Sequence, residues 1–324
     1  MPKYSGRKIA VGFGKETTRG TAVSPSTWFP RTDMDFEDKI ESVTNEVSIG
    51  VLVDSVDTAV VRIFSEGSIS GNFGVNGMSL PLLAAFGGVT TTTATTGAYK
   101  HTFSLSNTNE RQSLTIAMHD PVNPYKFALG TIKKLTLKYE QDKYIDVSIE
   151  MMAQRGVADG TLTPAFTTDN YLLGRHANVK IASATAGLNA ALNRNIKNFE
   201  ISLEFNVEEE YNLGNITPTD FLTGSIGISG SIESVFQNES DYKTDTFAGS
   251  SRAMRITAIN PDVTIGVSSN PSFVLELPKI TYEEISRKMS NDEIVTQTCK
   301  FKGHYSTADA KAIVAELINT VSSI

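Results

Sequence analysis

Residues 199–208 read FEISLEFNVE, and this stretch decides the fold class of the chain. Apolar and polar side chains alternate along it, which is typical of a β-strand with one buried face and one solvated face. Residues 135–139 alternate in the same way, and residues 145–151 continue the alternation beyond a polar turn at 140–143. Two such runs around a short turn predict a β-hairpin. We therefore expect a mainly β protein.

Three short motifs occur twice, in the same order along the chain. The pairs are Glu46, Ile49 and Gly50 with Glu210, Leu213 and Gly214; Ile69-Ser70-Gly71 with Ile228-Ser229-Gly230; and Lys134-Leu135-Thr136 with Lys279-Ile280-Thr281. A repeat of about half the chain is too long for a solenoid unit and favours a duplicated domain. We expect two tandem β-domains, residues 1–160 and 161–324, joined by an irregular stretch near residues 156–172.

Helices are expected to be few. Ser79 is a candidate cap for a short helix over residues 80–86, with Pro81 in its first turn and Gly87 ending it. The polar residues 238–249 are expected to form a loop or a second short helix. At the C-terminus, Ser306 or Thr307 is a candidate cap for a third helix. Its apolar stripe would consist of Ile313, Val314, Leu317, Ile318 and Val321.

Two segments lack a clear secondary-structure pattern. Residues 1–30 contain several glycines and prolines, which favours an arm or loop. Residues 89–97 form a threonine-rich run, which we also expect to be a loop.

Composition restricts the classes of function. The formal net charge of -7 argues against a protein that coats nucleic acid, which would need a basic face. Apolar runs are far shorter than the ~20 residues that span a bilayer, and we expect no secretory signal near the N-terminus. Cys299 is the single cysteine, so an intrachain disulfide is impossible. Its phase in a predicted strand indicates a small buried hydrophobic side chain.

The chain offers no pattern for catalysis or for binding a metal or cofactor. The four histidines lack metal-ligand spacing, and one cysteine cannot build a thiolate zinc site. His119 and Asp120 are adjacent and would point to opposite faces of a strand. The acidic clusters at residues 208–210 and 283–284 are typical of solvated strand ends. Residues 12–17 lack the first glycine and the Ser/Thr of a phosphate-binding loop. We therefore expect no enzyme activity, no metal and no cofactor.

One segment is a candidate contact surface. Residues 42–61 carry many valines among small polar residues, with neither lysine nor arginine. The segment could be an ordinary hairpin within the sheet, or a long hairpin arm that reaches a partner. Exposed strands of this composition would aggregate unless a partner covered them. The candidate contact residues of such an arm are Val47, Ile49, Gly50, Val51, Val53 and Val56.

The order of these elements resembles a known family. Residues 12–22 read GFGKETTRGTA and are followed by Trp28-Phe29-Pro30. This opening, the strand at 67–73, the short helix at 80–86 and the hairpin at 133–155 resemble major tail tube proteins of long, flexible-tailed bacteriophages. The resemblance covers the whole chain through diffuse motifs.

The resemblance implies β-sandwich or partial-barrel domains, each with a short helix, that close into rings around a channel. Family members usually carry one tube domain, whereas the repeat here suggests two, so three chains would form a ring with pseudo-sixfold symmetry. Residues 42–61 occupy the place of the family's inter-ring hairpin, with residues 206–222 as the counterpart in the second copy. The acidic balance suits a lumen through which DNA passes without binding during ejection.

The expected partners are other copies of the chain and the tape measure, tail terminator and baseplate proteins, with no membrane. The expected location is the virion tail, after synthesis in the cytoplasm of the bacterial host. An alternative is a β-rich virion or cell-surface binding module, such as an adhesin or baseplate component. A further alternative is a hydrolase whose carboxylates come together from distant strands.

Overall fold

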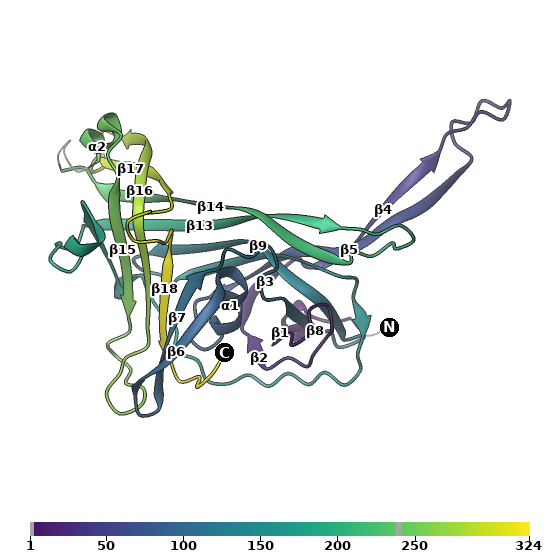
Figure 1. Ribbon diagram of the computed structural model, residues 1–324, viewed down its shortest axis with the longest axis horizontal. Helices are drawn as coiled ribbons and strands as arrows, with labels where there is room; N and C mark the ends of the chain where they lie inside the picture. The colour runs from purple at the N-terminus through teal and green to yellow at the C-terminus, as the bar shows by residue number, and fades with distance from the viewer. Residues whose placement is uncertain (1–2, 238–241) are drawn as a thin grey trace.

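Antiparallel strands make up most of the protein (Figure 1). The computed structural model describes residues 3–237 and 242–324. Its strands are β1 (Ala10–Lys15), β2 (Thr27–Phe29), β3 (Arg31–Met34), β4 (Glu37–Asn45), β5 (Asp57–Asn72), β6 (Gly87–Thr95), β7 (Ala98–Leu105), β8 (Leu114–His119), β9 (Tyr125–Glu140), β10 (Asp146–Ala153), β11 (Val157–Ala158), β12 (Ala177–Ala182), β13 (Ile196–Glu210), β14 (Asp220–Val235), β15 (Arg252–Ile259), β16 (Ser272–Lys288), β17 (Thr296–Gly303) and β18 (Val314–Asn319). Its helices are α1 (Ser79–Phe86) and α2 (Lys243–Ala248), with 3-10 turns at Gly6–Lys8, Gly174–His176 and Thr185–Gly187.

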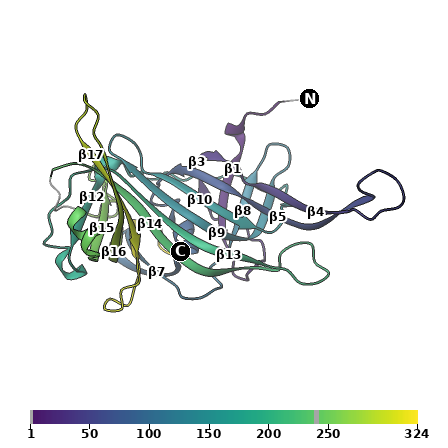
Figure 2. The ribbon, with the colours of Figure 1, turned by 90° about the horizontal axis from the view of Figure 1, so that it is seen from above.

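A long antiparallel sheet, which we call the main sheet, runs through both halves of the chain (Figure 2). Strands β3 and β4 both pair with β5, and the order then continues through β10, β9, β13, β14 and β17 to β16. The pairing of β9 with β13 joins the halves, so the sheet is continuous between them.

Strands β9 and β16 each take part in two sheets. Residues 125–130 of β9 pair with β8, whereas residues 134–138 lie between β10 and β13. In the same way, residues 272–276 of β16 lie between β15 and β18, and residues 280–288 pair with β17. Leu129, buried and with a φ of 60°, marks the bend in β9. One smaller sheet contains β2, β1, β8 and the start of β9. The other, which we call the covering sheet, contains β6, β7, β18, the start of β16, β15 and β12. The bends fold both smaller sheets over the main sheet and make a sandwich.

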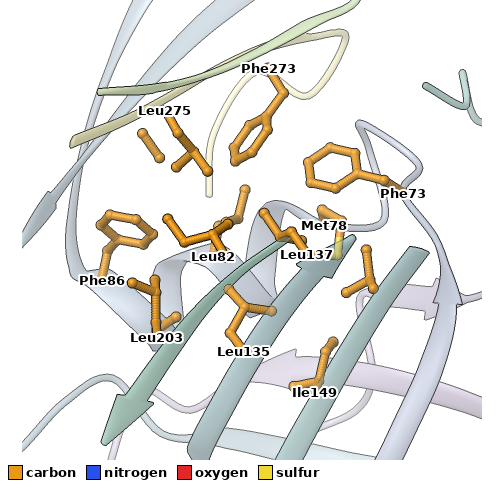
Figure 3. Packing of buried hydrophobic residues seen from close by; sticks show 14 of the residues in the cluster. Phe73, Met78, Leu82, Phe86, Leu135, Leu137, Ile149, Leu203, Phe273 and Leu275 are labelled. Carbon is orange, nitrogen blue, oxygen red and sulfur yellow. The ribbon is translucent and has the colours of Figure 1, made fainter. Parts of the chain in front are cut away.

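Helix α1 fills the space between the layers (Figure 3). Leu82 lies between Leu135 and Leu203 of the main sheet and Phe273 and Leu275 of the covering sheet. All five side chains are at most 4% exposed, so apolar burial holds the layers together. Residues from both halves of the chain therefore share one core.

The repeated motifs occupy matching positions in the main sheet. Ser70 of β5 pairs with Ser148 of β10, which pairs with Thr136 of β9. Ser229 of β14 pairs with Lys302 of β17, which pairs with Thr281 of β16. The glycines of the first motif, Gly50 and Gly214, lie in the β4–β5 and β13–β14 turns with φ values of 84° and 93°. The strand group β5–β10–β9 thus corresponds to β14–β17–β16. The division into domains 1–160 and 161–324 stays a prediction.

The mainly β fold and the first short helix are confirmed. Helix α1 begins at Ser79 and ends before Gly87, whose left-handed φ of 83° lets its N–H reach the carbonyl of Leu83. The predicted cap is wrong, because Met78 is the N-cap and Ser79 is the first helical residue. The hydroxyl of Ser79 accepts instead from the side-chain amide of Asn319 at 3.0 Å. The hairpin over 135–151 is present as β9 and β10. Helix α2 lies within the predicted segment 238–249, of which residues 238–241 are outside the described residues.

The predicted C-terminal helix is wrong, because residues 314–319 form strand β18. The side chain of Ser306 does accept from the N–H of Asp309 at 3.2 Å, as a helix cap would. Ala310 then takes a left-handed φ of 53°, which closes a turn in place of a helix. Strand β18 pairs with both β7 and β16, so pairing with two open strands prevails over the helical spacing of the apolar residues.

Two segments expected to be irregular contain strands. Residues 10–15 form β1, which pairs with β8, and residues 27–29 form β2; Met1 and Pro2 lie outside the described residues. The threonine-rich run lies mostly in β6, which pairs with β7. Threonine is β-branched and favours strands, so its polarity was a poor guide to its conformation.

Candidate assembly surfaces

The hairpin of β4 and β5 projects from the body of the protein, at the upper right of Figure 1. We call residues 37–62 the arm. All of β4 and the first residues of β5 are exposed. The aliphatic side chains predicted as contact residues are also exposed: Val47 56%, Ile49 65%, Val51 56%, Val53 69% and Val56 48%. Gly50, the remaining predicted residue, lies in the same turn with open space around it.

Backbone pairing closes the arm up to its tip. The N–H of Val56 donates to the carbonyl of Asn45 at 2.9 Å, and this bond closes the turn of residues 46–55. Two ion pairs lie nearer the base, Lys39 with Glu37 and Arg62 with Glu41. Of the two interpretations of residues 42–61, the projecting arm is the one that the structure matches. Whether the arm contacts another ring stays a prediction.

The second hairpin braces the base of the arm. The turn between β13 and β14 lies beside β5, where the N–H of Ile63 donates to the carbonyl of Ile216 at 2.7 Å. The guanidinium of Arg62 lies 4.7 Å from the ring centroid of Tyr211 in a cation–π contact. Gln154 donates to the carbonyl of Pro218. The two hairpins are therefore unequal, since one projects and the other docks on its base.

The face of the main sheet opposite the core is polar. A row of small hydroxyl side chains crosses its strands, with Thr136 and Ser202 2.9 Å apart and Ser70 and Ser148 3.4 Å apart. Carboxylates outnumber lysines on either side of this row. The carboxylates are Glu140, Asp146, Glu150, Glu200, Glu204 and Glu233, and the lysines are Lys134, Lys138, Lys300 and Lys302.

Charge pairs modify the electrostatics at one end of this face. Glu140 accepts from Lys138 at 2.7 Å and from Lys143 at 2.6 Å. These hydrogen bonds from two ammonium groups lower the pKa of Glu140 to about 2. The same bonds raise the pKa of both lysines. The carboxylate therefore stays ionised well into the acidic range.

The histidines and the cysteine have structural surroundings. His101 is fully buried between Thr91 and Asn319, and burial lowers its pKa. His304 bonds to Thr281, and His119 ends β8, as expected from the sequence. Cys299 is fully buried, and burial raises the pKa of its thiol to about 12. Such a thiol is a poor nucleophile.

Within residues 3–237 and 242–324, no three His, Cys, Asp or Glu side chains come close enough together to hold a metal ion. Over the same residues, neither α-helix has the length and apolar character needed to cross a membrane.

Sequence reasoning missed the docking of the second hairpin on the base of the arm. Tyr211, Ile216 and Pro218 carry this docking, and a motif of three residues around Gly214 gives no sign of it. The matching glycines at the two turns were the available signal, since they indicated that both turns end hairpins.

Comparison with known proteins identifies the family. A family model described as phage tail tube protein matches residues 6–303, which is most of the chain. No curated protein matches it. The matched region spans the main sheet, the arm and α1. The chain therefore belongs to the phage tail tube protein family and is a structural component of a phage tail.

Proposed function

We propose that this chain is the subunit of the tail tube of a long, flexible-tailed phage. Three copies would close a ring with pseudo-sixfold symmetry, and rings would stack into a tube through which DNA leaves during ejection. The two matching strand groups support this stoichiometry, because three chains contribute six groups. A head-to-tail contact that closes gives such a ring.

The observation that carries the proposal is the arm. Residues 47–56 at its tip expose six aliphatic side chains, with Leu52 the most exposed, and no lysine or arginine occurs between residues 42 and 61. A projecting apolar hairpin of this kind would be an aggregation hazard on a free monomer. Burial against the next ring would remove these side chains from water and hold the stack together.

The polar face of the main sheet is the proposed lining of the channel. Its excess of carboxylates would repel DNA phosphates, and its hydroxyl row would present small neutral groups between the charges. DNA would then move along the channel without counterion-releasing contacts. The tape measure, tail terminator and baseplate proteins are the proposed partners at the inside and the ends of the tube, in the virion.

Electron microscopy of the concentrated protein tests the proposal. We expect rings or tubes with a central channel, and trimers by mass photometry before stacking. A protein that stays monomeric at high concentration, without rings in the images, would rule the proposal out.

A further inference from the structure

The main sheet ends in two open edges. Strand β3 pairs with β5 on one edge, and no strand within the described residues pairs with its other edge. At the far end, Ile280 of β16 pairs with Arg252 on one edge and Gly303 on the other. From Thr281 onward, β17 is the one strand in the described part of the chain that pairs with β16. Each open edge presents backbone N–H and C=O groups that can pair with a further strand.

The chain already contains a junction of the kind that these edges could form. Strand β9 corresponds to β16 in the repeat, and its equivalent edge pairs with β13 over residues 134–140. Strand β13 pairs with β14 just as β3 pairs with β5: Leu203 lies opposite Ile228, and Met34 lies opposite Ile69. We therefore propose that β16 pairs antiparallel with β3 of the next copy of this chain, in the register of the β9–β13 junction. The inference rests on the proposed function and specifies its ring contact.

The internal junction fixes which residues meet. Leu135 lies opposite Leu203, and Thr136 lies opposite Ser202, across β9 and β13. Ile280, the counterpart of Leu135, already pairs with Arg252 and Gly303, so the new pairing would begin at Thr281, opposite Asp33 of the next copy. Leu203 and Leu135 are 4% and 1% exposed. Ile280 is fully buried, whereas Met34 is half-buried. Met34 would lie at the end of the proposed pairing, where the neighbouring β16 would cover part of its remaining surface.

Charges and hydroxyl groups agree with the same register. Lys134 lies opposite Glu204 in the internal junction. The equivalent residues, Lys279 and Asp35, flank the proposed pairing, and both are exposed and again of opposite charge. The next pair in the internal junction is Thr136 with Ser202, whose hydroxyl oxygens are 2.9 Å apart. Its counterpart is Thr281 with Asp33 of the next copy.

Cysteine cross-linking tests this register. Directly opposite residues of antiparallel strands have Cα atoms about 4.5–5.5 Å apart, within the range that a disulfide spans. The variant Thr281→Cys with Asp33→Cys should form disulfides between chains under mild oxidation, giving a species of three linked chains on a non-reducing gel. Cys299 is fully buried, so it should not contribute.

Two matched variants serve as a positive control and a shifted-register control. Thr136→Cys with Ser202→Cys places the same pair in the internal junction and should give a disulfide within one chain. Thr281→Cys with Asp35→Cys moves one cysteine two residues along the edge, where Cβ atoms of diagonal neighbours are roughly 7 Å apart. We expect at least a several-fold lower yield of linked chains from this second variant.

The outcomes separate the inference from the proposed function. Rings without the Thr281–Asp33 link, or with an equal yield from the Thr281–Asp35 variant, would overturn the register and leave the tube intact. A wild-type protein that forms no rings would overturn both. Where the double variant does not assemble, mixing the two single-cysteine variants with wild-type chains must still yield linked pairs, and their absence overturns the register.

Discussion

Ile63 donates its backbone N–H to the carbonyl of Ile216 at 2.7 Å, and this bond ties the second hairpin to the base of the arm. The body of the protein therefore supports the base of the arm at Ile63, and the part of the arm nearer its tip extends into solvent. This anchor separates what the arm contributes to folding from what it contributes to assembly.

Deleting residues 47–56 should leave the fold intact and stop tube growth. The deleted side chains lie outside the buried core, so the melting temperature should stay within a few degrees of wild type. Rings should still form, and electron microscopy should show no stacks. A matched replacement of the six exposed aliphatic residues of this segment, Leu52 included, by serine should act in the same way. Normal polymerisation of either variant would show that the arm is not the stacking contact.

Strand β18 should be essential for stability. Leu317 is fully buried and lies between β7 and β16. Leu317→Ala should lower the free energy of unfolding by about 2–5 kcal/mol, because it removes core packing. The neighbouring Glu316→Ala breaks the partly exposed ion pair with Lys100 and should lower it by about 1 kcal/mol or less. Chemical denaturation gives both values. Similar losses for both variants would mean that β18 is not packed in this way.

The fate of this strand shows what the sequence could and could not predict. Ile313, Ala315 and Leu317 alternate with period two, yet Ile313, Leu317 and Val321 also fit a helical face, so the local pattern is ambiguous. The edges of β7 and β16 decide between a strand and a helix, because they offer backbone groups that a strand can pair with. These edges exist only after the chain has folded. The strand at 199–208 had no such ambiguity, because its alternation persists through ten residues.

The assembly surfaces divide in the same way. The arm was predictable from its unusual valine content and lack of basic residues. The open edges of β3 and β16 were not, because an edge is defined by the strand that is missing beside it. The strand pairing was also needed to see that the repeated motifs align. Ser70 lies in line with Thr136 through Ser148, and Ser229 lies in line with Thr281 through Lys302.

Reversing charge on the polar face should make the channel retain DNA. Glu200→Lys with Glu204→Lys adds positive charge beside Lys138 and Lys134. We expect tubes that bind short duplex DNA at low salt, with binding lost as salt increases. DNA held inside the tube should resist nuclease. The control, Glu110→Lys with Glu293→Lys, makes the same change on exposed loops. Equal nuclease protection in both variants would mean that this face does not line the channel.

Acid should weaken the protein partly through Glu140. Its pKa in the folded state, about 2, lies below the ordinary value of 4.5, so its pairing with Lys138 and Lys143 stabilises the fold above pH 4.5. That contribution is lost as the pH falls from 4.5 towards 2. Glu140→Gln should therefore be less stable than wild type at pH 6, by about 1 kcal/mol or less for a surface pair. The difference should shrink by pH 2.5.

Urea denaturation at a series of pH values measures this difference. Glu110→Gln, on an exposed loop, serves as the control variant. A gap between wild type and Glu140→Gln that stayed constant from pH 6 to pH 2.5 would contradict the assignment.

The inequality of the two hairpins has a mechanical consequence. The turn of residues 211–219 is held against the body by Tyr211 and Ile216, so the arm is the one projecting hairpin of the described chain. In a ring of three chains, the strand groups that line the channel would repeat six times around the axis, whereas the arms would repeat three times. Each ring would then seat on its neighbour at intervals of a third of a turn. Twisting one end of the tube would be transmitted through three joints at every level, and the torsional stiffness of the tail would be set by the bending of β4 and β5.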